Sequence, residues 1–255
     1  MMKERLLVPE DSPLRRPPTE LSRRQILFLD GLRYAAEMAD VAYQRLFEGL
    51  MHVADTSDEP STRDIARLML DAWSIVDAVH RFVDLVGAMP GLSHGPWLRV
   101  LRGICSDLLA LRDDIQHQNE RAVVVHGQPN QLWGYLSWAV VDRSGQHTGR
   151  WLMVSAGSEY VGDRWLFVGP NALPFSVPPG RIRLTAFGRR VYLGRCVQAM
   201  TEAVGHLTEQ LKVGSVRPVG EPAIDRRGAD SVMEGGIEVL YAPASAPTTA
   251  DEENQ

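Results

Sequence analysis

The chain has 255 residues, 44% of them hydrophobic, so it can bury a sizeable core. Its formal net charge is −5, which differs from the strongly basic balance of most nucleic-acid-binding proteins. No apolar run approaches the roughly 18 to 20 residues that cross a bilayer, and residues 1–21 lack the apolar segment of a secretion signal. Composition therefore argues against membrane and secreted proteins, and we expect a cytoplasmic protein with no membrane contact.

The first 20 residues contain four prolines, which predicts a flexible N-terminal segment, residues 1–20. Thr19 or Ser22 can cap a first helix that runs to about Ala54. The polar, turn-rich residues 55–60 then separate this helix from the next one.

A second helix is expected to open at Ser61 or Thr62, because Asp64 places a negative charge near its positive end. It closes at residues 89–91. Pro96 suits the first turn of a third helix, which we expect to continue to about residue 121. A fourth helix covers residues 193–211.

All four helices carry apolar residues alternately three and four positions apart, the repeat that keeps one seam facing a partner helix. The seams of the first two are Leu29, Leu32, Ala36, Ala39, Tyr43, Leu46, Leu50, Val53 and Ile65, Leu68, Ala72, Ile75, Val79, Phe82, Val86. Those of the last two are Trp97, Leu101, Ile104, Leu108, Leu111, Ile115 and Leu193, Val197, Met200, Val204, Leu207, Leu211. The second helix has another apolar stripe at Met69, Trp73, Val76 and Val83, which predicts that the sheet or a second subunit covers it.

Residues 123–187 are rich in Val, Trp, Tyr and Leu and are broken by turn sequences, which predicts strands at about 132–141, 151–156, 165–168 and 182–186. The expected fold class is thus α+β, mainly α: an up-and-down four-helix bundle over residues 21–213, with a small antiparallel sheet inserted at about 123–189 between the third and fourth helices. Residues 214–255 carry the whole net charge of −5 and predict a disordered acidic tail, in which only residues 237–241 resemble a strand.

The two cysteines, Cys105 and Cys196, lie next to seam positions and outside any Cys-x-x-Cys spacing. We interpret them as small buried hydrophobic residues in a reducing compartment, with a disulfide or a metal pair as the alternatives.

Helical bundles often hold metals through Glu-x-x-His motifs that point into the core. This chain has Asp77-x-x-His80, Asp114-x-x-His117 and Glu202-x-x-x-His206, but the phase of the seams turns all of them outward. We therefore expect solvated helix faces with local ion pairs and no metal site. The chain also lacks a Gly-rich phosphate loop, and we expect no cofactor.

One polar motif stands out in the third helix: Arg112-Asp113-Asp114-Ile115-Gln116-His117. An arginine and a histidine five positions apart on a helix of a small bundle resemble the R-x4-6-H signature of the HEPN superfamily. That resemblance implies either a metal-independent endoribonuclease or a protein that only binds a nucleotide or a partner.

The chemistry of a nuclease suits these side chains. His117 could move a proton at the ribose 2′-hydroxyl, Arg112 could hold the phosphate, and Asp113 could orient the histidine ring. On a straight helix, however, Arg112 and His117 lie about 140° and roughly 7.5 Å apart. Such a site needs the helix to bend or end near Asp114, or two subunits that pair their motifs across a two-fold axis. Otherwise these residues form only an exposed polar ladder.

The predicted sheet offers another binding surface. Its segment carries seven arginines against three acidic residues, a net charge of +4, interleaved with tryptophans. Arg143, Arg150, Trp151 and Arg164 are our candidates for stacking bases and contacting phosphates, with packing of the aromatic residues on the helices as the alternative.

These observations lead to two functional hypotheses. We expect a HEPN-like bundle, forming a homodimer, that binds a protein partner, a nucleotide or RNA. The alternative is a metal-independent endoribonuclease that uses Arg112 and His117.

Overall fold

The computed structural model describes residues 7–55, 60–117, 133–142, 150–155, 175–176 and 181–220. The chain divides into two units, residues 1–223 and 224–255, and the second lies outside the described residues, as do the predicted strands at 165–168 and 237–241. Within the described part the protein is mainly helical with a small antiparallel sheet, as the sequence predicted. No helix among these residues has the length and apolar character needed to span a membrane.

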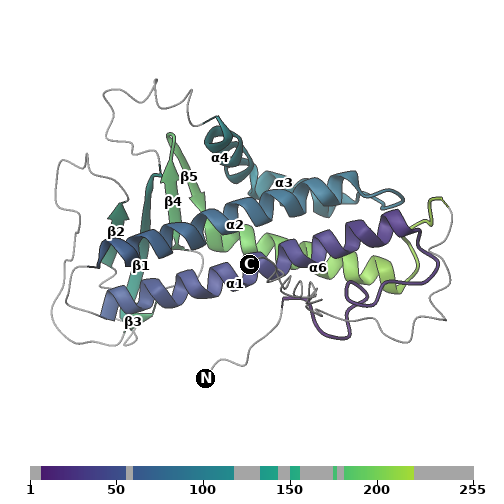
Figure 1. Cartoon of the computed structure of the whole chain (residues 1–255), viewed down its shortest axis with the longest axis horizontal. Helices are drawn as coiled ribbons and strands as arrows, with labels where there is room; N and C mark the ends of the chain where they lie inside the picture. Colours follow the sequence, from purple (N-terminus) through teal and green to yellow (C-terminus); the bar gives the residue numbers. More distant parts are fainter. Residues whose placement is uncertain are drawn as a thin grey trace, which may run out of the picture. The chain divides into compact units, whose positions relative to one another are not determined.

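Two long helices and a third that follows the sheet form most of the core. They are α1 (Arg23–Asp55), α2 (Thr62–Ala88) and α6 (Leu193–Lys212), and each packs on the other two. Figure 1 shows α1 and α2 side by side, with α6 behind them. The predicted seams are confirmed: every seam residue of these three helices is buried except Tyr43 and Ile65, which are partly buried.

The start of α2 shows how local sequence sets a helix boundary. The Ser61 side chain accepts a hydrogen bond from the Asp64 N–H, and the Asp64 carboxylate accepts one from the Ser61 N–H, at 3.2 Å each. This reciprocal capping box satisfies two backbone donors that the first turn leaves free.

The predicted third helix is not continuous. The structure has α3 (Pro96–Ile104) and α4 (Ser106–Gln116), separated at Cys105, whose φ of −91° and ψ of 5° leave the helical region. The break changes which residues face the core: Leu101, Leu108 and Leu111 are buried as predicted, but Ile104 is 44% exposed and Cys105 is buried instead. A continuous seam was therefore wrong at its centre, and Figure 1 shows α4 leaving the line of α3.

The sheet has the strand order β2-β1-β4-β5, entirely antiparallel, and β3 pairs with the far end of β1. Its strands are β1 (Tyr135–Asp142), β2 (Arg150–Ser155), β3 (Phe175–Ser176), β4 (Arg183–Ala186) and β5 (Arg189–Tyr192). Phe187 and Gly188, both with positive φ, make the two-residue turn that joins β4 to β5. Strand β5, which the sequence analysis missed, leads directly into α6.

Residues 7–20, assigned from sequence to a flexible segment, lie against the helices. Val8 and Leu14 are completely buried, and Arg15 forms a 2.6 Å ion pair with Glu37 of α1. Two buried apolar side chains and one ion pair thus hold this segment against the helices.

Residues 214–220, assigned to the acidic tail, pack in the same way. Val216 is buried, and the buried Gln25 side chain donates to the carbonyls of Pro90 and Arg217 at 3.0 and 2.7 Å. One amide of α1 thereby connects the α2–α3 turn to the segment after α6.

The two cysteines are free thiols, as the sequence favoured, and both are buried between the α3–α4 break and α6. A hydrogen bond with the Cys196 thiol, together with burial, raises the pKa of Cys105 far above its ordinary value.

The reactivity of the thiols tests this packing. The raised pKa keeps Cys105 in the unreactive thiol form, and burial keeps reagents away from both side chains. We therefore expect neither cysteine of the native protein to react with Ellman's reagent at pH 8, and both to react in denaturant. The exposed variant Ser106→Cys serves as a fast-reacting control, and rapid labelling of the native wild type would contradict the packing described.

Burial also acts on Asp71 of α2. Its desolvation raises the pKa of Asp71 above the ordinary 3.8, and the ion pair with Arg45 at 3.2 Å opposes this only in part. A carboxyl whose pKa is higher in the folded state destabilises that state progressively as the pH rises through the folded pKa.

We therefore expect Asp71→Asn to raise the melting temperature at pH 7 and to lose this advantage below about pH 4, where the wild-type carboxyl is protonated in both states. Thermal denaturation followed by circular dichroism measures the difference, and Asp11→Asn, at an exposed position, is the control. A lower melting temperature of Asp71→Asn at pH 7 would show that the pair with Arg45 outweighs the cost of burial.

Candidate functional site

The polar motif of the sequence analysis lies on α4, which begins immediately after the break at Cys105. Arg112 and Asp113 are on the second half of this helix, and His117 is its C-cap, with φ −99° and ψ 29°. The helix therefore continues past Asp114 and ends only at Gln116, so the Cα of His117 keeps nearly helical spacing from Arg112. A common phosphate would need the other condition, two subunits that pair their motifs.

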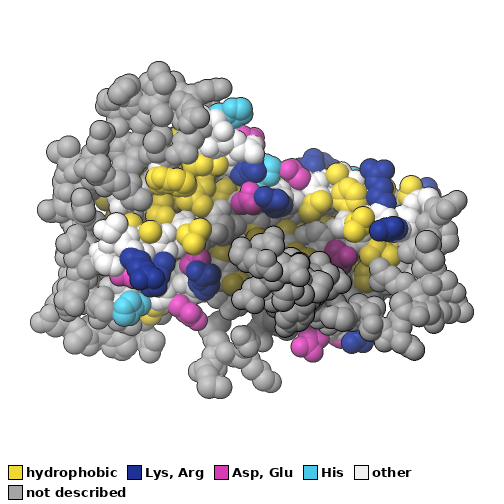
Figure 2. Space-filling view, in the orientation of Figure 1, with side chains coloured by type: hydrophobic (Ala, Val, Ile, Leu, Met, Phe, Trp, Pro, Cys, Tyr) yellow, Lys and Arg dark blue, Asp and Glu magenta, His cyan; other side chains and the backbone are white. Residues whose placement is uncertain are grey.

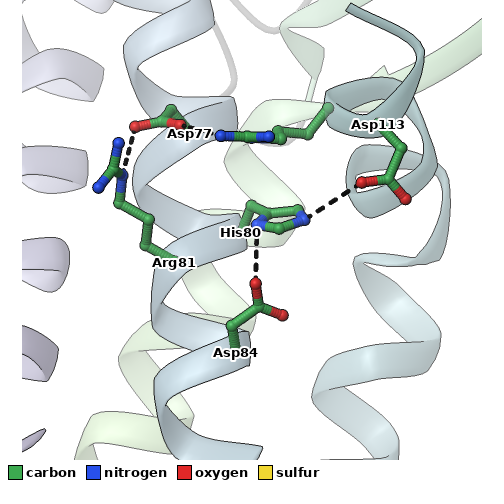
Figure 3. A network of polar contacts seen from close by, with 6 residues as sticks. Asp77, His80, Arg81, Asp84 and Asp113 are labelled. Atoms are coloured by element: carbon green, nitrogen blue, oxygen red, sulfur yellow. Dashed lines mark hydrogen bonds and ion pairs between the residues drawn. The ribbon is translucent and has the colours of Figure 1, made fainter. Parts of the chain in front are cut away.

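Arg112 and Asp113 point across to α2, where they join four polar residues spaced along one face of that helix: Asp77, His80, Arg81 and Asp84 (Figure 3). We call these six residues the α2–α4 network. His80, Arg81 and Asp84 follow Asp77 by three, four and seven positions, which puts the four α2 residues on adjacent turns of one helix face. Arg112 and Asp113 of the motif thus form one cluster with the Asp77-x-x-His80 pair, which the sequence analysis treated separately.

His80 is at the centre of the network. Its Nδ1 lies 3.2 Å from Asp84 Oδ2 and its Nε2 lies 3.5 Å from Asp113 Oδ1, and the side chain is only 16% exposed. A neutral imidazole has one N–H, whereas an imidazolium has two and can donate to both carboxylates. His80 therefore lies between a carboxylate of its own helix and one of α4, and it bridges the two helices.

Arg112 is engaged as well. Its Nη2 lies 3.4 Å from Asp77 Oδ1, the other oxygen of Asp77 accepts a hydrogen bond from Arg81 Nε at 2.6 Å, and the Arg112 side chain is 19% exposed. Asp77 is thereby shared between two guanidinium groups. A phosphate that approached Arg112 would compete with a carboxylate already in place.

His117 is not one of the six residues of this network. It is exposed, just past the end of α4. The structure thus brings Arg112 and Asp113 together with α2, while His117 lies past the last turn of the same helix.

The next residue of the motif, Asp114, has a different role. Its side chain is 8% exposed and accepts a 2.7 Å hydrogen bond from Arg189 Nε of β5. The sequence analysis placed Asp114 on a solvated helix face, and the structure shows that it is buried. The signal available in the sequence was its position beside the apolar seam, together with the arginines that precede α6.

The candidate base-binding residues are only partly described. Arg143 and Arg164 lie outside the described residues, and Arg150 and Trp151 lie in β2 with their side chains outside them. Among the other tryptophans of the sheet segment, Trp138 is completely buried and cannot stack on a base. Trp133 is 49% exposed, and its ring meets Trp73 of α2 edge-on with centroids 6.3 Å apart.

The Trp73–Trp133 contact bears on the second apolar stripe of α2. Met69, Val76 and Val83 of that stripe are buried, and the Trp73 Nε1 donates to the carbonyl of Trp133 at 3.3 Å. Trp133, in the segment that leads into β1, therefore contacts this face of α2, for which the sequence analysis expected the sheet or a second subunit as the cover.

The network has the composition of an ion-pair cluster. It contains three carboxylates, two guanidinium groups and one imidazole, so its charges nearly cancel. Across the described part of the chain, no three His, Cys, Asp or Glu side chains gather closely enough to hold a metal ion.

Comparisons with known proteins found no match. No protein-family model matches the chain, and no curated protein or solved structure matches it.

The buried contact between Asp114 and Arg189 can be tested directly. Arg189→Ala removes the charge-assisted hydrogen bond that joins β5 to a buried carboxylate. We expect the free energy of unfolding to fall by about 2 kcal/mol. This is less than the loss for a fully buried pair, because the Arg189 side chain is partly in water. Urea denaturation measures it.

The neighbouring Arg190 is exposed and provides the matched control, Arg190→Ala, for which we expect a change of less than about 0.5 kcal/mol. Equal effects of the two variants would rule out a stabilising role for the Asp114–Arg189 contact.

Proposed function

We propose that this chain is a HEPN-like helical-bundle protein that acts by binding, to a protein partner, a nucleotide or RNA, and does not cut RNA. The observation that carries this proposal is the contact between Arg112 and Asp77. Transition-state stabilisation in RNA cleavage needs donors that are aimed at the reacting phosphate and not already committed. In this structure the guanidinium of Arg112 is largely covered and faces a carboxylate.

The fold supports the same interpretation. We propose that α1, α2, the α3–α4 pair and α6 occupy the four positions of an up-and-down bundle, since α2 packs on each of the others and α6 packs on α1 and α3. We also propose a cytoplasmic location, which the two free, buried thiols support.

One observation favours the alternative, a metal-independent endoribonuclease. His117 is exposed at the C-terminal end of α4, where an RNA can reach its imidazole ring. A nuclease would then require Arg112 to exchange Asp77 for the phosphate of a substrate.

Cleavage and binding of RNA by the purified protein distinguish the two. Wild type and Arg112→Ala/His117→Ala are incubated with single-stranded RNA in EDTA, with circular dichroism to check folding, and binding is followed by fluorescence polarisation of a labelled RNA. Arg99→Ala/His52→Ala, at exposed positions of α3 and α1, is the matched control.

We expect no cleavage by wild type above the level of the double variant. General acid–base catalysis contributes about 100- to 10,000-fold. Cleavage that falls at least 100-fold in the double variant, and not in the control, would therefore overturn the binding proposal and establish the nuclease.

A further inference from the structure

Helix α1 has an apolar stripe on the side that faces solvent. Leu27, Tyr34, Met38 and Val41 are 62%, 51%, 55% and 55% exposed, although each is a large apolar side chain. Their spacing of seven, four and three positions places all four on one line along the helix. The other exposed apolar residues in the described part of the chain do not form such a series on a single helix.

This stripe is opposite the core. The residues of α1 that pack on α2 and α6, such as Leu29, Leu32 and Ala36, are completely buried and lie about half a turn away around the helix. A helix that is apolar on two opposite sides needs neighbours on both sides, and within the described residues α2 and α6 pack on the side away from the stripe. An aligned apolar seam on a helix surface is the usual mark of a protein interface.

The charges at the two ends of the stripe indicate what covers it. Arg23 and Arg24 are exposed near the start of α1, and Glu48 is exposed near its end. Two copies of α1 packed in parallel would place arginine against arginine and glutamate against glutamate. If the two helices packed antiparallel, the arginines of each copy would lie next to Glu48 of the other. Oppositely charged residues pair in the same way beside the apolar seams of coiled coils.

We propose that the solvent-facing stripe of α1 binds a second copy of this chain, with the two α1 helices antiparallel about a two-fold axis near the level of Ala36. In this register Tyr34 of each copy lies opposite Met38 of the other, a favourable aromatic–sulfur contact. Arg24 lies opposite Glu48 in both directions, because a two-fold interface repeats every contact. The aliphatic part of Arg45, which is itself paired with Asp71, covers Leu27 of the other copy.

Dimerisation through this stripe goes beyond the proposed function and does not depend on it. None of the stripe residues belongs to the α2–α4 network. The oligomeric state and the binding or cleavage of RNA are also measured separately, so either proposal can fail alone.

Size-exclusion chromatography with light scattering tests the surface. We expect the full-length wild type to have twice the chain mass of 28.3 kDa at micromolar concentration, and Met38→Glu to have the mass of a single chain. Val100→Glu, at an equally exposed apolar position of α3, is the matched control and should remain a dimer. A monomeric wild type, or a dimer that survives Met38→Glu, would overturn the proposal.

Charge reversal tests the antiparallel register. Arg24→Glu and Glu48→Arg should each weaken dimerisation roughly three- to tenfold, and the double variant should recover wild-type affinity because it restores opposite charges across the interface. Both positions are exposed, and Arg24→Glu places a negative charge in the first turn of α1, which the helix dipole favours, so we expect both variants to fold. Additive losses in the double variant would overturn the antiparallel register.

Discussion

The contact between Asp114 and Arg189 decides where α4 lies. A carboxylate that is 8% exposed is costly in apolar surroundings unless a charged donor stays with it, and Arg189 Nε supplies that donor at 2.7 Å. Because β5 continues directly into α6, this one contact ties α4 both to the sheet and to the last helix. If α4 turned about its own axis or moved away from β5, Asp114 would lose this donor.

A second set of contacts holds α4 from the other side. Arg112 and Asp113 reach Asp77 and His80 of α2, while the seam residue Leu111 is buried beneath them. Three consecutive polar residues span about 200° around a helix, so residues 112–114 contact two different neighbours. Apolar packing alone permits small rotations of a short helix, whereas charge pairs on two sides specify one orientation. The motif that resembles a catalytic signature therefore positions α4 in this fold.

Periodicity was enough to predict α1, α2 and α6, because an apolar seam of several turns has one stable solution, which is to face the core. It could not reveal the break at Cys105, since Leu101, Leu108 and Leu111 fit the same repeat with or without a bend between them. The sequence analysis also missed β5, whose short strand is dominated by arginines that suggested a surface patch. Burial of Asp114 and packing of Val8 depend on tertiary neighbours distant in sequence, about which a local pattern carries no information.

For the candidate site, residue type alone could not decide between cleavage and binding. Arginine and histidine on one helix satisfy the chemical requirements of RNA cleavage, but catalysis depends on which atoms those side chains already face. Near Arg112, a phosphate would have to displace Asp77, and Asp77 would then keep only Arg81 as a partner. Each such exchange takes a charged group out of a satisfied pair, which costs free energy that substrate binding must supply. Exposed groups outside the network, among them Trp133 and Arg190, can meet a ligand without that cost.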